Sequence, residues 1–342
     1  MTHSMQIAQP MQIDGKSLLV TGGTGSFGRR FIRTVLERHA PARVIVFSRD
    51  EQKQYDMQQD PLLRDHPAMR FFIGDVRERD RLEMAMQGVE TVIHAAALKH
   101  VPTAEYNPIE CIRTNVHGAE NLVQAAFRAG VRQVIALSTD KAASPINLYG
   151  ASKLASDKIF VAANNLAGPR GTRFAVVRYG NVVGSRGSVV PLFERLIANG
   201  ADSLPITDPR MTRFWITLSQ GVDFVLSSLS LMSGGEIFVP KIPSMTIADV
   251  TRAMAPGLPQ RTVGIRPGEK LHEAMITEDD SRTTLEMDDR FVIEPAFAFW
   301  NRDHLDAAGA KPVPEGFRYT SDGNTDWLDA DGFRALLAEA RR

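Results

Sequence analysis

The sequence predicts an α/β protein with a doubly wound parallel sheet and a smaller C-terminal α/β region. Short apolar runs alternate with stretches of helical length from about residue 17 to residue 182, which is the pattern of strands and crossover helices. The first apolar run leads directly into glycines at three-residue spacing. After residue 182 the regular alternation stops, so the rest of the chain should form a different region.

The first strand and the turn that follows it predict a dinucleotide site of the Rossmann type. Leu18 opens an apolar run, and Gly22, Gly25 and Gly28 follow before an amphipathic stretch. In such folds the first glycine makes the tight turn, the second admits a pyrophosphate, and the third lets the helix pack on the strand. The helix N-terminus adds free N–H groups and a positive dipole end. The three glycines alone also fit an ordinary turn.

The end of the second strand bears on cofactor choice, because this position reads the adenosine ribose. The strand at 43–48 is followed by Arg49, whose guanidinium suits a 2′-phosphate. Asp50 comes next and suits a free 2′-hydroxyl. Arg49 favours NADP, while Asp50 leaves NAD open. A solvated surface charge is the other interpretation of Arg49.

Two further strands should end at the ligand edge of the sheet. One ends at Asp75 and Val76, where a side chain can reach the adenine. The other leads into small residues from Ala95, which let backbone lie against a flat ring, and then into Lys99. In open α/β sheets, ligands bind at these carboxyl ends.

The helix predicted after this strand runs from about residue 108 to residue 129. Asn107 suits its N-cap, and Gly130 suits its end. This helix should carry Thr114 and Asn115.

The segment STDKAASPINLYGASK carries the residues for chemistry. Tyr149 and Lys153 are four positions apart, so a helix places them on one face. The ammonium should favour the phenolate and lower the pKa of the tyrosine, which makes it a base. Thr139, Asp140 and Lys141 follow a predicted strand directly. A second acid/base pair beside Tyr149 suggests chemistry with more than one proton transfer.

Composition limits the function classes. The chain has 342 residues and a formal net charge of zero. The zero net charge argues against a broad electrostatic surface for nucleic acid or membrane. Cys111 is the single cysteine, so no disulfide can form within the chain. His94 and His100 have no companions at metal-ligand spacing, so no metal site is expected. No apolar run is long enough to span a membrane, and residues 1–15 suggest a flexible leader without a signal peptide. We expect a cytoplasmic enzyme.

The predicted organisation has two main parts. Residues 16–182 should form the NADP-binding Rossmann domain, with part of the later chain returning to it. Residues 183–342 should be mainly a substrate-binding and oligomer-contact region. Four arginines in irregular contexts, any of which also fits a surface position, are candidates for a diphosphate: Arg178, Arg186, Arg213 and Arg266.

The motifs together resemble the extended short-chain dehydrogenase/reductase superfamily. GGTGSFG, SRDEQKQ, FFIGDVR, HAAALKHVP, RYGNVVGSRGSVVP, DPRMTRFWIT and GIRPGEKLHE, with the segment around Tyr149, resemble more closely the inverting UDP-N-acetylglucosamine 4,6-dehydratases of pseudaminic acid biosynthesis. The resemblance covers about residues 17 to 276. Relatives that feed other deoxysugars often carry Met at the position of Tyr149. Long relatives carry a membrane-spanning N-terminal region, and this chain is expected to resemble the short form without it. Family members commonly form oligomers, often hexamers, so a homo-oligomer is expected.

Carried over by matched position, the resemblance implies detailed sites. The implied catalytic residues are Asp140, Lys141 and Tyr149, with Lys153 and Thr139 beside them. The glycine turn and the resemblance together imply an NADP site at Gly22, Thr24, Gly25, Ser26, Phe27, Gly28, Ser48, Arg49, Asp50, Glu51, Gln52, Lys53, Asp75, Val76, Ala95, Lys99, Thr114, Asn115, Tyr149, Lys153 and Val182. The implied UDP-sugar site comprises Lys99, Asn181, Arg186, Gly187, Ser188, Val189, Arg213, Arg266 and Glu269.

The implied reaction gives UDP-2-acetamido-2,6-dideoxy-β-L-arabino-hex-4-ulose. Tyr149, as phenolate, takes the 4-hydroxyl proton as hydride passes to NADP⁺. Lys141 then removes the carbon-5 proton, and Asp140 protonates the departing 6-hydroxyl. Finally, hydride returns to carbon 6 and a proton is delivered to carbon 5. Lys141 needs a lowered pKa for this role. Retaining dehydratases carry Asp-Glu where this chain has Asp140-Lys141, a plausible cause of inversion. Lys141 as a mere substrate contact is the alternative role.

Two other functions fit parts of the pattern. An epimerase or dehydrogenase of a nucleotide sugar needs Tyr149 and Lys153 but not the second pair. A non-catalytic NADP-binding regulator needs the glycine turn alone.

Overall fold

The computed structural model describes residues 13–168, 171–185, 187–297 and 300–341. Arg186, predicted to bind substrate, lies outside these residues, as do the first twelve residues of the predicted leader. None of the helices in the described ranges is long and apolar enough to cross a membrane.

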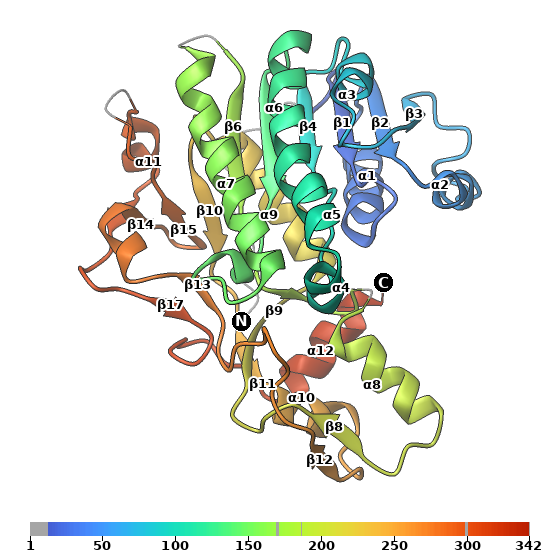
Figure 1. Ribbon diagram of the computed structural model, residues 1–342, viewed down its shortest axis with the longest axis vertical. Helices are drawn as coiled ribbons and strands as arrows, with labels where there is room; N and C mark the ends of the chain where they lie inside the picture. The colour runs from blue at the N-terminus through green and yellow to red at the C-terminus, as the bar shows by residue number, and fades with distance from the viewer. Residues whose placement is uncertain (1–12, 169–170, 186, 298–299, 342) are drawn as a thin grey trace.

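A ten-stranded sheet is the centre of the larger part of the molecule (Figure 1). Its strands are β1 (Ser17–Thr21), β2 (Arg43–Ser48), β3 (Met69–Ile73), β4 (Thr91–His94), β5 (Gln133–Leu137), β6 (Arg173–Val177), β10 (Ile237–Pro240), β14 (Thr284–Glu286), β15 (Arg290–Ile293) and β16 (Lys311–Pro312). Their order is β16-β14-β15-β10-β6-β5-β4-β1-β2-β3. The strands from β10 to β3 pair in parallel, whereas β15, β14 and β16 pair antiparallel. The predicted Rossmann-type fold is confirmed.

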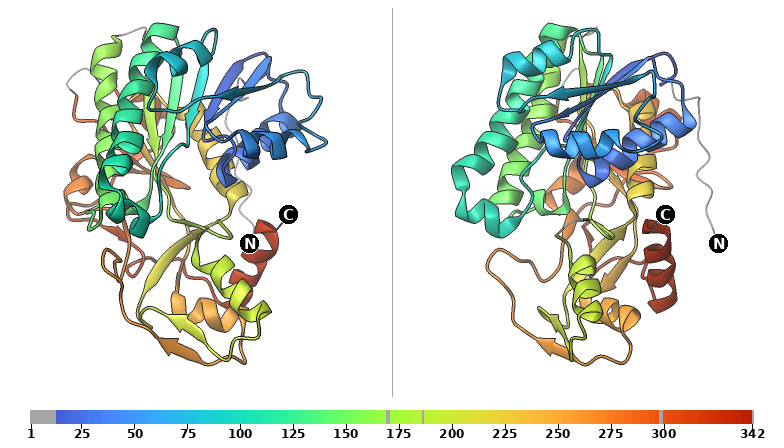
Figure 2. Two further views of the ribbon diagram at one scale, coloured as in Figure 1. Left: turned by 45° about the vertical axis from the view of Figure 1, so that its right-hand side comes forward. Right: turned by 90° about the vertical axis from the view of Figure 1, so that its right-hand side faces the viewer.

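Helices cover both faces of this sheet (Figure 2). On one face α3 (Arg79–Ala85), α6 (Gly118–Ala129) and α7 (Leu148–Ala167) pack side by side, and on the other α1 (Ser26–Arg38) packs against α9 (Leu218–Leu231). Because both faces are covered, β1, β2, β4, β5 and β6 are nearly continuous buried apolar runs. Shorter helices complete the larger part: α2 (Glu51–Gln58), α4 (Val101–Tyr106), α5 (Pro108–Ile112) and α11 (Asp303–Ala307).

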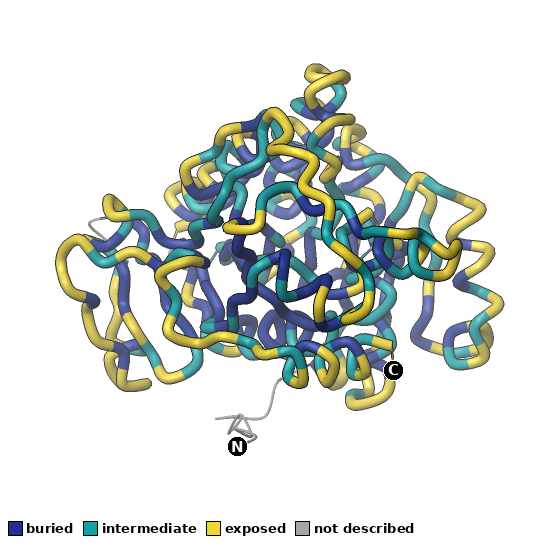
Figure 3. Tube along the Cα trace, turned by 90° about the horizontal axis from the view of Figure 1, so that it is seen from below, coloured by how far each residue is buried: buried dark blue, intermediate teal, exposed yellow. Residues whose placement is uncertain are grey.

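The smaller region lies at the other end of the molecule and has its own core. One sheet joins β7 (Asn181–Val182), β9 (Thr212–Ile216) and β11 (Ser244–Thr246), and β8 (Leu204–Ile206) pairs with β12 (Gln260–Thr262). A further pair, β13 (Ala274–Ile276) and β17 (Tyr319–Thr320), packs on the core of the larger part through Met275, Ile276 and Tyr319. The helices of the smaller region are α8 (Val189–Ala198), α10 (Ile247–Met254) and α12 (Ala330–Ala340). Phe193, Trp215 and Phe333 pack at its centre. Seen from below, buried stretches occupy the middle of the trace and exposed stretches its rim (Figure 3).

The predicted helix after Asn107 is confirmed in extent but is not uniform. Asn107 makes no side-chain cap hydrogen bond; its Nδ2 instead donates to the carbonyl oxygen of Thr103. A π-helical turn, η1 (Arg113–His117), interrupts the α-helix between α5 and α6, and Gly130 ends α6 in the left-handed conformation. Such turns commonly mark functional positions, and this one carries Thr114 and Asn115.

The run RFAVVRYGNVVG, residues 173–184, contributes strands to two different sheets. β6 ends at Val177, and Asn181 and Val182 form β7 in the sheet of the smaller region. The chain therefore crosses between the two parts of the molecule immediately beside the carboxyl end of the large sheet.

Candidate active site

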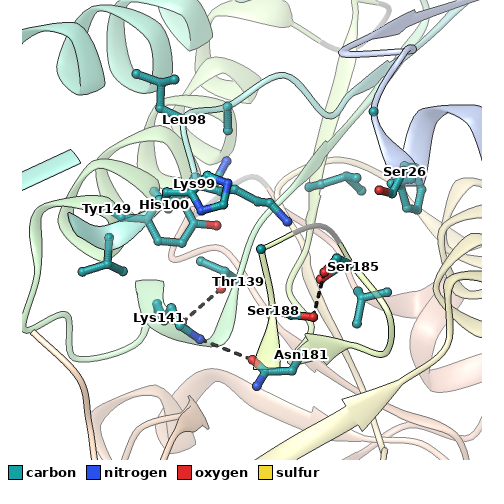
Figure 4. A pocket seen from close by; sticks show the side chains of 18 of the residues that line it. Ser26, Leu98, Lys99, His100, Thr139, Lys141, Tyr149, Asn181, Ser185 and Ser188 are labelled. Carbon is teal, nitrogen blue, oxygen red and sulfur yellow. Dashed lines mark hydrogen bonds between the residues drawn. The ribbon is translucent and has the colours of Figure 1, made fainter. Parts of the chain in front are cut away.

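A cavity of about 890 Å³ lies at the carboxyl ends of the parallel strands (Figure 4). Its wall includes the glycine turn, the ends of β2, β4 and β5, and the start of α7. Segments of the smaller region, including residues 187–189 and 266–270, complete it. The sequence-predicted cofactor and substrate positions therefore share one cavity.

The glycine turn has the geometry predicted for a dinucleotide. Gly22 has a φ of +64°, and a Cβ on it would lie 2.9 Å from the Cα of Ala96. A Cβ on Gly28 would lie 2.5 Å from the Cα of Gly23. These positions admit no side chain, so backbone lies directly on the cavity.

The end of β2 presents cations to this part of the cavity. Ser48, Arg49 and Lys53 line it. Asp50 does not, because its Oδ1 accepts the Lys53 backbone N–H at 3.0 Å and its Oδ2 lies 2.5 Å from Lys53 Nζ. The Asp50 carboxylate is thus engaged as the N-cap of α2.

Asn115 is buried behind the cavity wall. Its Oδ1 accepts from Leu98 N at 2.8 Å, while its Nδ2 donates to Leu98 O at 2.9 Å and to Ser152 Oγ at 2.9 Å. Asn115 braces the segment that presents Lys99, and Thr114 reaches the cavity directly.

The start of α7 brings Tyr149 and Lys153 to the cavity. Asn147 caps the helix by accepting the Gly150 N–H at 2.8 Å. Burial raises the pKa of Tyr149 to about 12, even though the Lys141 charge and a hydrogen bond with Thr139 act to lower it. The expectation of a lowered tyrosine pKa is therefore wrong for the protein alone. Burial also lowers the pKa of Lys153, and nearby Asp157 opposes this shift.

Lys141 is held between two carboxylates. Its Nζ lies 3.0 Å from Asp140 Oδ1, 3.2 Å from Glu273 Oε1 and 3.5 Å from Asn181 Oδ1. Burial lowers the pKa of Lys141, but attraction to Asp140 and Glu273 outweighs burial and raises it above its ordinary value. The expectation that its surroundings lower the pKa of Lys141 is wrong, because the attraction of Asp140 and Glu273 for its proton exceeds the effect of burial.

Asp140 lies behind Lys141. Its side chain is fully buried and is absent from the cavity wall, and Thr139 donates to its Oδ1 at 2.9 Å. Burial raises the pKa of Asp140; Lys141 opposes this effect and Glu273 adds to it. Asp140 can thus exchange a proton with Lys141 but does not itself face the cavity.

Arg178 does not join the predicted arginine cluster. It is 3% exposed, donates to the carbonyl oxygen of Met275 and pairs with Asp157 at 3.5 Å. The diphosphate role considered for Arg178 is wrong, because its side chain turns into the protein away from the cavity.

Most predicted site residues line the cavity, but Asp50, Glu51, Gln52, Asn115 and Asp140 do not. Those that line it are Gly22, Thr24, Gly25, Ser26, Phe27, Gly28, Ser48, Arg49, Lys53, Asp75, Val76, Ala95, Lys99, Thr114, Thr139, Lys141, Tyr149, Lys153, Asn181, Val182, Gly187, Ser188, Val189, Arg213, Arg266 and Glu269.

Sequence reasoning missed Glu273 and the contacts of Lys270. Both line the cavity, and Lys270 Nζ donates to Ala143 O at 2.6 Å. The only signal was their place in the motif GIRPGEKLHE; neither has a periodic pattern that would mark it.

The fold and the site define a nucleotide-binding protein of the short-chain dehydrogenase/reductase type. The chain belongs to the family described as polysaccharide biosynthesis protein, whose model matches residues 18–295.

Two relatives illustrate the range of names within this similarity. The chain is 57% identical over 317 residues to a Campylobacter jejuni protein named UDP-N-acetylglucosamine 4,6-dehydratase (inverting), covering 91% of this chain and 94% of the relative. This match confirms the resemblance predicted from the motifs. The chain is also 40% identical to a Rickettsia canadensis protein named UDP-glucose 4-epimerase, and the match covers 94% of this chain and 95% of the relative.

Solved structures share the fold. Pen from Bacillus thuringiensis is 35% identical, with a TM-score of 0.87 and coverage of 97% of this chain and 99% of that one. DesIV, a dTDP-glucose 4,6-dehydratase from Streptomyces venezuelae solved with NAD bound, is 25% identical, with a TM-score of 0.67 and coverage of 85% and 95%. These similarities support a nicotinamide cofactor.

Proposed function

We propose that this protein is an inverting UDP-N-acetylglucosamine 4,6-dehydratase that uses NADP. The observation that carries the proposal is that Lys141 and Tyr149 line the same cavity as the dinucleotide turn, with Asp140 directly behind Lys141. A tyrosine alone serves oxidation at an alcohol, and the lysine and carboxylate add the groups that elimination of water needs. The Campylobacter jejuni relative carries the name of this activity.

The residues at the end of β2 fit NADP. The glycine turn leaves room for a pyrophosphate against backbone, and Arg49, whose Nη1 lies 3.5 Å from Asp75 Oδ2, offers a guanidinium beside it. Asp50, engaged by Lys53, is not presented to a ribose hydroxyl. When bound, the nicotinamide supplies a reversible oxidation: it accepts hydride from carbon 4 and returns hydride to carbon 6. No external reductant is therefore consumed.

The other half of the cavity fits a UDP-sugar. Lys99, Arg213, Arg266 and Lys270 line it. Burial lowers the pKa of Lys99, and repulsion by Lys141 adds to this shift. A diphosphate among these cations would relieve the repulsion and is the type of anion that this wall suits.

The chain's own groups then divide the proton transfers. With the Lys153 ammonium favouring ionisation of Tyr149 once the site is loaded, the phenolate takes the 4-hydroxyl proton as hydride leaves carbon 4, and the resulting ketone acidifies carbon 5. Lys141 first passes its proton to Asp140, whose pKa is raised, and the neutral amine then removes the carbon-5 proton. The Lys141–Asp140 pair gives a proton to the departing 6-hydroxyl, which leaves as water. When hydride returns to carbon 6, a proton exchanged with solvent is delivered to carbon 5, and Tyr149 releases the proton that it took, so the transfers balance. Since Tyr149 stands where some related dehydratases have Met, we assign the product to pseudaminic acid synthesis.

An NMR time course with UDP-N-acetylglucosamine and NADP⁺ in deuterated water tests this function. The expected product is the 4-keto-6-deoxy sugar of L-arabino configuration, with solvent deuterium at carbon 5. Water loss without inversion at carbon 5 would contradict the inverting assignment.

The epimerase function is the second candidate, because the Rickettsia canadensis relative carries that name. Mass spectrometry of the product separates the two, since dehydration removes the mass of one water and epimerisation removes none. A product of unchanged mass would support the epimerase.

A further inference from the structure

We propose that Glu273 is a positioning residue that holds the Lys141 side chain at the cavity as an ammonium in the substrate-free protein. The inference rests on the function proposed above and adds a residue to its machinery. Glu273 is far from Lys141 in the sequence, and no motif links the two.

The contacts of Lys141 match the charged form of lysine. An ammonium has three N–H donors and no acceptor. Nζ is within 3.5 Å of one oxygen each from Asp140, Glu273 and Asn181, so each donor has an acceptor. A neutral amine has only two N–H groups, and its lone pair would face one of these oxygens. The third acceptor, Glu273, therefore favours the protonated state.

Hydrogen bonds to Ser321 hold the backbone of Glu273 in place. Its N–H donates to Ser321 Oγ at 2.9 Å, and the Ser321 N–H donates to Glu273 O at 2.8 Å. Ser321 is itself fully buried. Since β13 begins at the next residue and pairs with β17, the Glu273 carboxylate stands at a defined place beside the cavity.

Glu273 has more cations around its carboxylate than Asp140 has. Arg213 Nε and Lys270 Nζ each lie 3.8 Å from an oxygen of Glu273, in addition to Lys141. Burial acts to raise the pKa of Glu273, but these cations outweigh it and lower the pKa. Glu273 therefore stays ionised.

The groups that face Lys141 from other elements complete the charge balance. Asp140 and Glu273 attract its proton, Arg213, Lys99 and Lys270 repel it, and Tyr149 stands nearby as a neutral phenol. Because burial raises the pKa of Asp140, Asp140 is the carboxyl that can accept the Lys141 proton. Glu273 opposes that transfer by attracting the proton to Lys141, and so sets how readily the lysine becomes a base.

Competitive acetylation with acetic anhydride across a pH series, read by peptide mass spectrometry, tests the inference without substrate. Only the neutral amine reacts, so the labelling midpoint of Lys141 reports its protonation, with exposed Lys158 as reference. In Glu273→Gln the Lys141 midpoint should fall by about 1–3 pH units, because a charge partner at this distance is lost. Glu294→Gln, which removes a carboxylate that lies outside this cavity, should leave the midpoint unchanged.

An unchanged Lys141 midpoint in Glu273→Gln would overturn the inference. Should that variant fail to fold, Glu273→Asp retains the charge but withdraws it by one methylene, and a smaller fall is expected. No fall there would also overturn the inference.

The outcome is separable from the proposed function. If the unmodified protein does not dehydrate UDP-N-acetylglucosamine, the labelling still decides whether Glu273 controls Lys141. If it does dehydrate the sugar, carbon-5 deuterium exchange in Glu273→Gln should have its rising limb at lower pH. A decrease in rate with no shift of that limb would assign Glu273 a purely structural role.

Discussion

Gly28 and Gly23 approach so closely that a Cβ on Gly28 would stand 2.5 Å from the Cα of Gly23. The contact joins the first turn of α1 to the strand–helix loop that lines the cavity. Backbone atoms form both sides of it, so neither side can move away as a flexible side chain could. The spacing of the predicted dinucleotide turn is thus also a packing requirement.

Gly28→Ala should therefore destabilise the protein and weaken dinucleotide binding together. Overpacking of this kind costs roughly 1–3 kcal/mol of unfolding free energy. Urea denaturation and calorimetric titration with NADP⁺ measure the two effects. Gly221→Ala in α9 is the matched control, since its Cβ meets nothing within 4 Å, and it should be neutral or slightly stabilising. Equal stability of the two variants would contradict the packing argument.

Arg49→Ala should weaken NADP⁺ binding selectively. A charge-assisted hydrogen bond to a 2′-phosphate contributes roughly 1.5–3 kcal/mol, which predicts a Kd about 10- to 100-fold higher for NADP⁺ and little change for NAD⁺. Isothermal titration with both dinucleotides measures this. Arg64→Ala is the control, because the Arg49 and Arg64 side chains are each 57% exposed but Arg64 is not on the cavity wall. A parallel loss for both cofactors would remove the basis for the NADP assignment.

Lys141→Met should abolish proton exchange at carbon 5. The substitution keeps an unbranched side chain but removes the group that contacts both Asp140 and Glu273. We expect turnover of UDP-N-acetylglucosamine to fall about 10²- to 10⁴-fold, as measured by deuterium incorporation in the NMR assay. Lys158→Met, on the exposed side of α7, should retain full activity. Intact exchange in Lys141→Met would reduce Lys141 to a substrate contact.

His94 should make the protein less stable in acid. It is 1% exposed and hydrogen-bonded to Thr21, and burial lowers its pKa to about 3, with a smaller contribution from Lys153. The unfolded chain, with an ordinary histidine pKa of about 6.5, binds a proton that the folded protein does not. Stability should therefore fall as pH decreases from about 6.5 towards 3, by up to about 1.4 kcal/mol per pH unit from this group.

Urea unfolding of His94→Gln between pH 4 and pH 6.5 isolates the contribution of His94. Glutamine can retain a hydrogen bond with Thr21 but does not titrate, so the slope of unfolding free energy against pH should be smaller in the variant. Identical slopes in the two proteins would mean that protonation of His94 does not affect the free energy of unfolding.

Local patterns predicted much of the fold and many of the residues that line the cavity. Gly22 and Gly28 could be placed because turn geometry and close packing are properties of neighbouring residues. Tyr149 and Lys153 could be placed on one face because helical periodicity spans four positions. By contrast, no local rule ends β6 at Val177 or inserts a π-turn at Arg113–His117, since both depend on packing against distant segments.

By itself, the sequence determined the α/β class, the glycine turn and the residue types available for acid/base chemistry. Only the tertiary structure decided that Arg178 faces Asp157, that Asp140 lies behind Lys141, and that Glu273 stands beside them. The physical reason is that periodicity and turn geometry act over a few residues, whereas a pKa depends on every charge within several ångströms. Two charges together reverse the expected pKa shift of Lys141: Asp140, its neighbour in the chain, and Glu273, which only folding brings near.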